Sequence, residues 1–265
     1  MDSKPASEKP FSFLEAFAQS IVLRDWYRQA ARIPTRSAVR YAVLLFLLTG
    51  TLTGAKHAMD AHAFLGDLAE NIPDDFPTLT VEKGKARADG PQPRKITSRP
   101  LTLVIDTTGR QTSLGEDVLD GFFVSADRVL VKRSGYEAEA LRFSDLPDTT
   151  IKRQAILRLL DGARTAVFPL AIAGSLALTL VVKPAHLLLV SPFAFLINWR
   201  GKQGWKPPEI FRMGVFALTP ALVADTFLTV TDLHGPVTFG FPLAVLAWYW
   251  AFGLTAPHRP AAVAS

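Results

Sequence analysis

The stretch AVFPLAIAGSLALTLVV, residues 166–182, decides the fold class, because its seventeen consecutive residues include no charged side chain. A helix of this length and character can cross a hydrocarbon core of about 30 Å. Three further apolar stretches have a similar character, at residues 39–58, 209–231 and 237–254. The pattern predicts an α-helical integral membrane protein with four transmembrane helices.

The interval between the first two apolar stretches, residues 60–162, has a different composition. It contains short alternating or β-branched runs separated by turn signals such as Lys83-Gly84 and Thr108-Gly109. Strands are expected at residues 78–82, 101–106, 121–125 and 129–132, with a hairpin turning at Lys83-Gly84. Helices are expected at residues 61–71 and 151–160, each continuing into a span. The interval therefore predicts a small β-rich α+β domain.

The expected organisation has five segments along the chain. These are a cytoplasmic N-terminal segment (1–37), a first transmembrane helix (38–59), the α+β domain (60–162), the C-terminal transmembrane helices (163–255) and a tail (256–265). Lys183-Pro184 is expected to break the helix that starts at residue 166. Residues 184–199 then either lie at the interface, which gives four spans, or cross the membrane, which gives five.

Charge is unevenly distributed and predicts topology. Residues 1–40 hold seven Lys/Arg and four Asp/Glu, whereas residues 56–165 hold sixteen and seventeen. The basic excess therefore flanks the apolar stretches, which indicates orientation in a membrane and argues against nucleic-acid binding. We expect a cytoplasmic N-terminus, an uncleaved first span and residues 60–162 outside the cytoplasm. Four spans return the C-terminus to the cytoplasm.

An amphipathic helix is expected before the first span. Ser12 and Glu15 fit a capping box, and a helix over residues 13–31 should follow. Such a helix can lie on the inner leaflet, or it can pack on a partner or on the chain's own bundle. The candidate contacts to lipid headgroups are the cations at the predicted membrane edge: Arg24, Arg28, Arg32, Arg36, Arg40, Lys183, Arg200, Lys202 and Lys206.

Polar and small residues inside the apolar stretches are candidate functional positions. Asp225 lies within a predicted span, with Asp232 and His234 at its outer mouth. An ionised carboxylate in a membrane is costly unless it is paired, hydrated or protonated, so this cluster either handles a cation or proton or is satisfied by neighbouring helices. Gly50 and Gly54 form a small-xxx-small pair, which indicates either close helix packing or the ordinary tolerance of glycine in membrane helices.

Two other motifs invite enzymatic interpretations that the sequence does not sustain. Ile105-Asp106-Thr107-Thr108-Gly109 contains an Asp-Thr-Gly-like turn, but an aspartic protease needs a second carboxylate of this kind and the chain has no second copy. We expect a strand that ends in a turn, with Asp106 bonded to nearby amides. His57 and His62 flank Asp60 at a spacing that is poor for a metal. No cofactor, metal site or catalytic residue is predicted, and cysteine is absent.

The order of several short motifs resembles a bacterial family of multi-pass membrane proteins, domain-of-unknown-function family 1189, one member of which lies among genes for maltodextrin use. The matching elements are the Phe-rich start, Ile72-Pro73 with Phe76, Val81-Glu82-Lys83-Gly84, Ile105-Asp106-Thr107-Thr108-Gly109 and Phe216-Ala217-Leu218-Thr219-Pro220. The resemblance implies a membrane architecture in a bacterial inner membrane and transfers no site residues.

Three functions remain open at this stage. The first is a non-catalytic membrane protein that senses, regulates or supports a transport or envelope system through its outer domain. Its partners would be the lipid bilayer and a membrane or extracytoplasmic protein, with no nucleic acid. The second is a small transporter or channel that uses Asp225, although no inverted repeat is visible. The third is a membrane enzyme.

Overall fold

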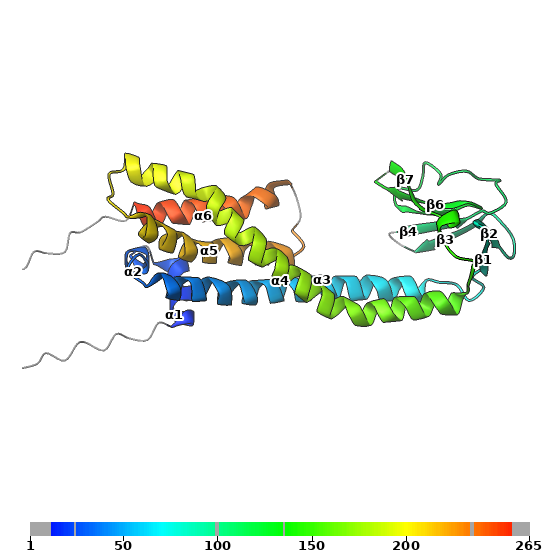
Figure 1. Ribbon diagram of the computed structural model, residues 1–265, viewed down its shortest axis with the longest axis horizontal. Helices are drawn as coiled ribbons and strands as arrows, with labels where there is room; N and C mark the ends of the chain where they lie inside the picture. Colours follow the sequence, from blue (N-terminus) through cyan, green and yellow to red (C-terminus); the bar gives the residue numbers. More distant parts are fainter. Residues whose placement is uncertain (1–11, 24, 99–100, 135, 234–235, 256–265) are drawn as a thin grey trace, which may run out of the picture. The chain divides into compact units, whose positions relative to one another are not determined.

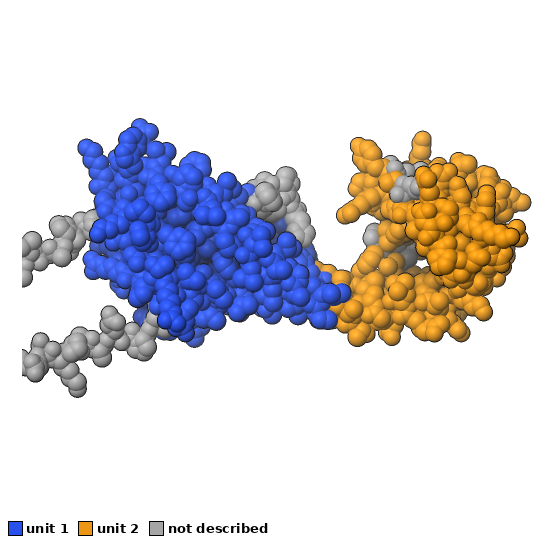
Figure 2. Space-filling view, in the orientation of Figure 1, with its two compact units in different colours: residues 1–58, 169–265 blue, residues 59–168 orange. Residues whose placement is uncertain are grey.

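The computed structural model describes residues 12–23, 25–98, 101–134, 136–233 and 236–255. The chain divides into two compact units (Figure 2), a helical unit of residues 1–58 with 169–265 and a β-rich unit of residues 59–168. Two long helices, α3 (Thr35–Glu70) and α4 (Arg153–Arg200), contribute residues to both units (Figure 1).

The helical unit is built from six helices. Besides parts of α3 and α4 it contains α1 (Phe13–Val22), α2 (Trp26–Ala30), α5 (Pro207–Val230) and α6 (Pro236–Leu254). Among the described residues, α3, α4 and α5 are long and apolar enough to cross a membrane, and α6 is a shorter apolar helix. The apolar stretches recognised in the sequence are therefore helices.

The first predicted helix is two helices, so the expectation of one helix over residues 13–31 is wrong. Ser12 does cap α1, because its hydroxyl accepts from the Glu15 amide at 3.4 Å. The helix nevertheless ends at Val22, and α2 turns Trp26 and Tyr27 into the core, where the Tyr27 hydroxyl donates to the Ser20 carbonyl at 2.9 Å. Burial of these rings against the chain's own bundle requires the bend.

Helix α4 is continuous across the position where a break was expected. The prediction of a break at Lys183-Pro184 is wrong, since α4 runs without interruption through Pro184 and ends at Arg200. The same helix also includes Pro169 and Pro192. Proline costs about 3 kcal/mol in a helix interior in water. Proline is tolerated in long apolar helices where neighbouring helices, side-chain hydroxyls or local adjustments satisfy the backbone groups that it frees. Leu187 and Val190, just after Pro184, pack into the core of the unit.

Helix α3 has two apolar faces with different surroundings. Tyr41, Ala42, Leu45 and Phe46 are buried in the helical unit, whereas the intervening side chains are exposed. The exposed set consists of large aliphatic side chains: Val39, Val43, Leu44, Leu47, Leu48 and Leu52. A helix with this distribution keeps its largest apolar surface on the outside, which is the reverse of an ordinary water-soluble helix.

The β-rich unit contains two sheets. The first has the order β2-β1-β8 and the second has the order β3-β4-β5-β6-β7. The strands are β1 (Leu79–Glu82), β2 (Lys85–Ala88), β3 (Arg94–Ser98), β4 (Leu101–Ile105), β5 (Gly121–Val124), β6 (Arg128–Arg133), β7 (Tyr136–Arg142) and β8 (Thr149–Ile151), and a 3₁₀ turn, η1 (Phe143–Asp145), follows β7. Ile105, Val124 and Phe143 pack with Leu79 and Val81 in one core that joins the sheets.

Four of these strands and one hairpin confirm the sequence prediction. β1, β4, β5 and β6 coincide with the expected runs, and β1 pairs with β2 through a turn in which Lys83 and Gly84 both have positive φ, 50° and 73°. That geometry is the type I′ hairpin turn, which favours glycine. The strands β3, β7 and β8 were not expected. RKITS and TTI are short and lack a regular apolar face, whereas YEAEALR alternates Tyr and Ala with Glu, which is a strand pattern that the sequence analysis missed.

The second sheet contains one parallel pair, β4 with β5, among antiparallel neighbours. A parallel pair needs a long connection, and residues 106–120 supply it. Leu114 and Val118 of this connection are buried against Val104 and Phe123. At the return, an added Cβ on Gly121 would lie 2.2 Å from the Thr102 carbonyl oxygen, so only glycine fits there.

Candidate functional site

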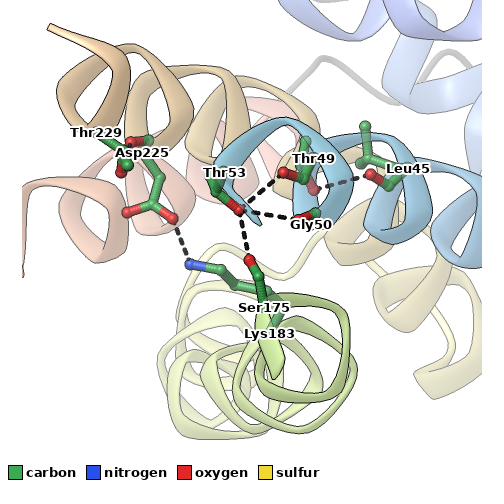
Figure 3. A network of polar contacts seen from close by, with 8 residues as sticks. All are labelled: Leu45, Thr49, Gly50, Thr53, Ser175, Lys183, Asp225 and Thr229. Carbon is green, nitrogen blue, oxygen red and sulfur yellow. Dashed lines mark hydrogen bonds and ion pairs between the residues drawn. The ribbon is translucent and has the colours of Figure 1, made fainter. Parts of the chain in front are cut away.

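An ion pair between α4 and α5 is the centre of the candidate site (Figure 3). The ammonium of Lys183 lies 2.6 Å from the Asp225 carboxylate. The two side chains are 13% and 33% exposed, so both are largely withdrawn from the surface of the helical unit. Sequence analysis placed Lys183 among headgroup contacts at the end of a span, whereas the structure places it inside α4 as the partner of Asp225.

Further polar groups lie near this pair on the same two helices. His186 lies one turn beyond Lys183 on α4. Thr229 donates its hydroxyl to the Asp225 carbonyl at 2.9 Å, and the Thr226 hydroxyl is buried without a hydrogen-bond partner among the described residues. His186 was not singled out from the sequence, because one histidine in an apolar run gives no signal until a charged pair is found beside it.

A second ion pair joins α3 to the end of α5. The Lys56 ammonium donates to both carboxylate oxygens of Asp232, at 3.0 and 2.9 Å. The structure therefore assigns Asp225 and Asp232 to different lysines and does not show them as one cluster. The third member predicted from the sequence, His234, lies outside the described residues.

Hydroxyl groups connect α3 to α4 beside these pairs. Thr53 and Ser175 share a hydrogen bond of 2.8 Å between their hydroxyls, and Thr53 also reaches the Thr49 carbonyl at 3.0 Å (Figure 3). Gly50 and Gly54 make this approach possible, since an added Cβ on Gly54 would lie 2.8 Å from the Ile172 Cα. Of the two interpretations of this glycine pair, the structure supports close packing, and the partner helix is α4.

A third connection joins α3 to α5 deeper in the unit. The hydroxyls of Tyr41 and Thr219 are 2.6 Å apart, and both side chains are fully buried. Together the ion pairs and hydroxyl contacts form a polar seam, which we define as Tyr41, Thr53, Lys56, Ser175, Lys183, Thr219, Asp225 and Asp232. Each member has a partner on another helix, so the seam orients α3, α4 and α5 against one another.

The remaining candidate headgroup contacts lie at the ends of helices. Arg32, Arg36, Arg40, Arg200, Lys202 and Lys206 are exposed. Arg28 pairs with the adjacent Asp25 at 3.0 Å, and Arg24 lies outside the described residues. Trp205, in the loop after α4, donates its indole N–H to the Leu254 carbonyl at 3.2 Å. The start of α5 and the end of α6 therefore lie at the same end of the helical unit as Arg200, Lys202 and Lys206.

The histidines near the end of the first apolar stretch do not form a metal site with Asp60. His62 contacts Arg164, with its Nε2 3.2 Å from the guanidinium, and its ring packs edge-on against Phe168. Across the ranges that the structure describes, no group of three metal-ligating side chains lies together.

Asp106 forms the turn that the sequence predicts at the end of β4. Its carboxylate is fully buried and accepts from the Thr108 amide at 2.9 Å, from the Thr108 hydroxyl at 2.6 Å and from the Gln111 amide. Burial raises the pKa of Asp106, but these hydrogen bonds outweigh burial and hold the pKa of the carboxyl below its usual 3.8. The local-turn interpretation is confirmed.

Replacing Asp106 with asparagine is expected to destabilise the β-rich unit by about 1–2 kcal/mol at pH 7, because the amide nitrogen cannot accept from the Gln111 N–H. Because the pKa of Asp106 is lower in the folded state, its ionised carboxylate stabilises the fold at pH values above the unfolded-state pKa near 3.8. This stabilisation is lost as the pH falls through the folded-state pKa. Hydrogen exchange of residues 101–125, corrected for the intrinsic rate, measures the free energy of opening of this region. The difference in this free energy between wild type and variant should shrink below about pH 4.

The exposed Glu116, in the same connection, provides the control for this substitution. Glu116→Gln should leave the exchange rates unchanged at pH 7 and below about pH 4. A difference between wild type and Asp106→Asn that stayed constant from pH 7 to acid would contradict the assigned role of the carboxylate.

Comparison with known proteins gives one match. The family model described as a protein of unknown function (DUF1189) matches residues 14–254, which is most of the chain. No curated protein matches the sequence, and no solved structure does.

Proposed function

The chain belongs to the DUF1189 family, whose function is unknown, and we propose from its own geometry that it is a non-catalytic integral membrane protein. In this proposal it serves as a sensor, regulator or accessory of a transport or envelope system. The helical unit anchors the chain in a bacterial inner membrane through four spans, α3, α4, α5 and α6. The β-rich unit lies outside the cytoplasm and binds a ligand or partner protein.

The observation that carries the membrane proposal is the inverted distribution of side chains in the helical unit. In the most apolar 18-residue stretch of α4, only 6% of the residues are buried, although this stretch has the highest mean hydropathy among the three candidate spans. Water would solvate the exposed aliphatic side chains of α3 and α4 at a high cost in free energy. Charged and hydroxyl groups instead face other helices, which is the arrangement that a lipid environment favours.

The charge at one end of the unit supports the orientation. Arg36 and Arg40 precede the proposed first span, while Arg200, Lys202 and Lys206 follow the second and are exposed. Cytoplasmic loops carry an excess of Lys and Arg. The contact of Trp205 with Leu254 supports an even number of spans, with the end of α6 on the side of the N-terminus. A cytoplasmic C-terminus follows from this topology.

The pairing of Asp225 favours the non-catalytic proposal over a transporter. A carboxylate that carries a proton or cation across a membrane needs access to water and an exchangeable partner. Asp225 is instead in direct contact with Lys183 at 2.6 Å, which neutralises its charge within the unit. The geometry therefore supports a structural role for the pair.

The proposed anchoring is tested on the full-length chain in cells. Alkaline carbonate should leave the protein in the membrane pellet, and a fluorescent reporter that folds only in the cytoplasm should be active when fused after Ser265. An alkaline phosphatase fused there should be inactive, because it requires the periplasm. A tag inserted beside Gly109 should be accessible from outside cells with a permeabilised outer barrier.

Recovery of the chain in the carbonate supernatant would refute membrane anchoring. An active phosphatase after Ser265 would refute the four-span topology and leave five spans. A tag at Gly109 that only the cytoplasm can reach would reverse the proposed orientation.

A further inference from the structure

A cavity of about 240 Å³ lies within the β-rich unit, between the sheet of β3, β4 and β5 and the ends of α3 and α4 that belong to this unit. Figure 2 shows this unit hollowed between its sheet and helical parts. The residues around the cavity include Leu68, Ile72 and Phe76, together with Phe122, Ile156 and Leu160.

The lining of this cavity is almost wholly apolar. Asn71, in the turn after α3, is the one polar side chain among the lining residues, and its amide nitrogen donates to the Asp67 carbonyl of α3 at 2.7 Å. Phe122 of β5 remains 39% exposed although it faces the cavity. The sheet and the two helices therefore leave apolar side chains accessible that a tightly packed core would cover.

The chemistry of the lining selects the class of ligand. A sugar, nucleotide or peptide would leave its polar groups without hydrogen-bond partners here, and a buried polar group without a partner is costly. A cavity of about 150 Å³ lined by Leu, Ile and Phe binds a benzene ring. The larger volume here, about 240 Å³, has room for a chain of several methylene groups.

We propose that this cavity binds one linear hydrocarbon chain, supplied by a fatty acid or by a lipid with a single acyl chain. The inference rests on the proposed function, because it names the ligand of the β-rich unit. Leu68 and Leu160 lie on α3 and α4, the two helices that also carry proposed spans. Each additional buried methylene group tightens binding about fourfold until the cavity is filled.

The absence of cysteine from the chain permits a clean test by thiol labelling. Leu160 lines the cavity, and its neighbour Leu159 on the same helix is 72% exposed. The full-length variants Leu160→Cys and Leu159→Cys are reconstituted in phosphatidylcholine nanodiscs and treated with a maleimide, with and without palmitate. At about ten times its dissociation constant, palmitate should slow labelling of Leu160→Cys about tenfold and leave Leu159→Cys unchanged.

A chain-length series and a second lipid refine the result. Fatty acids from eight to sixteen carbons should protect Leu160→Cys with rising affinity and then reach a plateau. Lysophosphatidylcholine, used below its micellar concentration, distinguishes a lipid with one acyl chain from a free fatty acid. If both lysophosphatidylcholine and palmitate protect Leu160→Cys, the hydrocarbon chain can come from a lipid. Protection by palmitate alone indicates a free fatty acid, and either result supports the proposal.

The proposal is overturned if palmitate protects neither cysteine or slows both equally, or if an apolar hexapeptide protects Leu160→Cys and palmitate does not. A photoactivatable palmitate added to the wild-type chain keeps the test valid if a variant fails to fold. Its cross-links should map to the peptides that carry Leu68–Phe76 and Ile156–Leu160, and cross-links elsewhere only would also overturn the proposal. Carbonate extraction of the same wild-type protein reports membrane anchoring separately.

Discussion

Replacing Lys183 with alanine is expected to destabilise the helical unit by about 3–5 kcal/mol, because it leaves the Asp225 carboxylate without its counter-ion. The two side chains are 2.6 Å apart and 13% and 33% exposed, and in the proposed topology both lie within spans. Asp225→Ala should have a similar effect, since it leaves the Lys183 ammonium unpaired. Thermal unfolding of the purified protein and its steady-state amount in membranes measure the loss.

A double substitution separates a structural pair from a functional carboxylate. Lys183→Met combined with Asp225→Leu removes both charges and fills similar volume, so most of the stability should return. The exposed Lys206 supplies the matched control, and Lys206→Ala should change the melting temperature very little.

Two outcomes would contradict this account. If the single variants are as stable as wild type, the pair does not hold α4 to α5. If Asp225→Asn keeps its normal amount and stability but abolishes the protein's cellular role, the carboxylate has a function of its own and the transporter alternative gains support.

Replacing Gly54 with alanine is expected to destabilise the same unit by about 1–3 kcal/mol through overpacking. The added methyl would lie 2.8 Å from the Ile172 Cα and 3.1 Å from the Ala171 carbonyl oxygen, so backbone atoms have to move. Separation of α3 from α4 would also stretch the Thr53–Ser175 hydrogen bond, which is 2.8 Å long. Alanine gains about 1 kcal/mol of helix propensity over glycine, and the strain has to exceed this gain.

Gly174 is the matched control for this prediction. It lies on α4, and an added Cβ there would meet nothing within 4 Å. Gly174→Ala should therefore be neutral or stabilise the protein by up to about 1 kcal/mol in thermal unfolding. Equal melting temperatures for Gly54→Ala and Gly174→Ala would show that α3 and α4 do not approach as closely as the structure places them.

The sequence alone determined the features that depend on neighbouring residues. Uninterrupted apolar stretches predicted the long helices, because a helix satisfies its own backbone whatever surrounds it. The Lys83-Gly84 turn and the Asp106 turn were also predictable, since their hydrogen bonds join residues a few positions apart. The strands β3 and β8 were not, because their short polar sequences become strands only by pairing with more apolar neighbours in the sheets, whereas the alternation in β7 was visible and was missed.

Only the tertiary structure decided which distant groups meet. The sequence identified Asp225 as a costly residue that a neighbouring helix can satisfy, but it did not identify the partner, since Lys183 lies forty-two positions away on a helix expected to break at that lysine. The bend between α1 and α2 and the apolar cavity likewise depend on packing against segments far along the chain. Hydrophobicity and turn chemistry act over a few residues and are visible in the sequence. Ion pairs, close contacts between helices and cavities depend on how whole helices and strands pack together. A pattern of neighbouring residues in the sequence does not specify that packing.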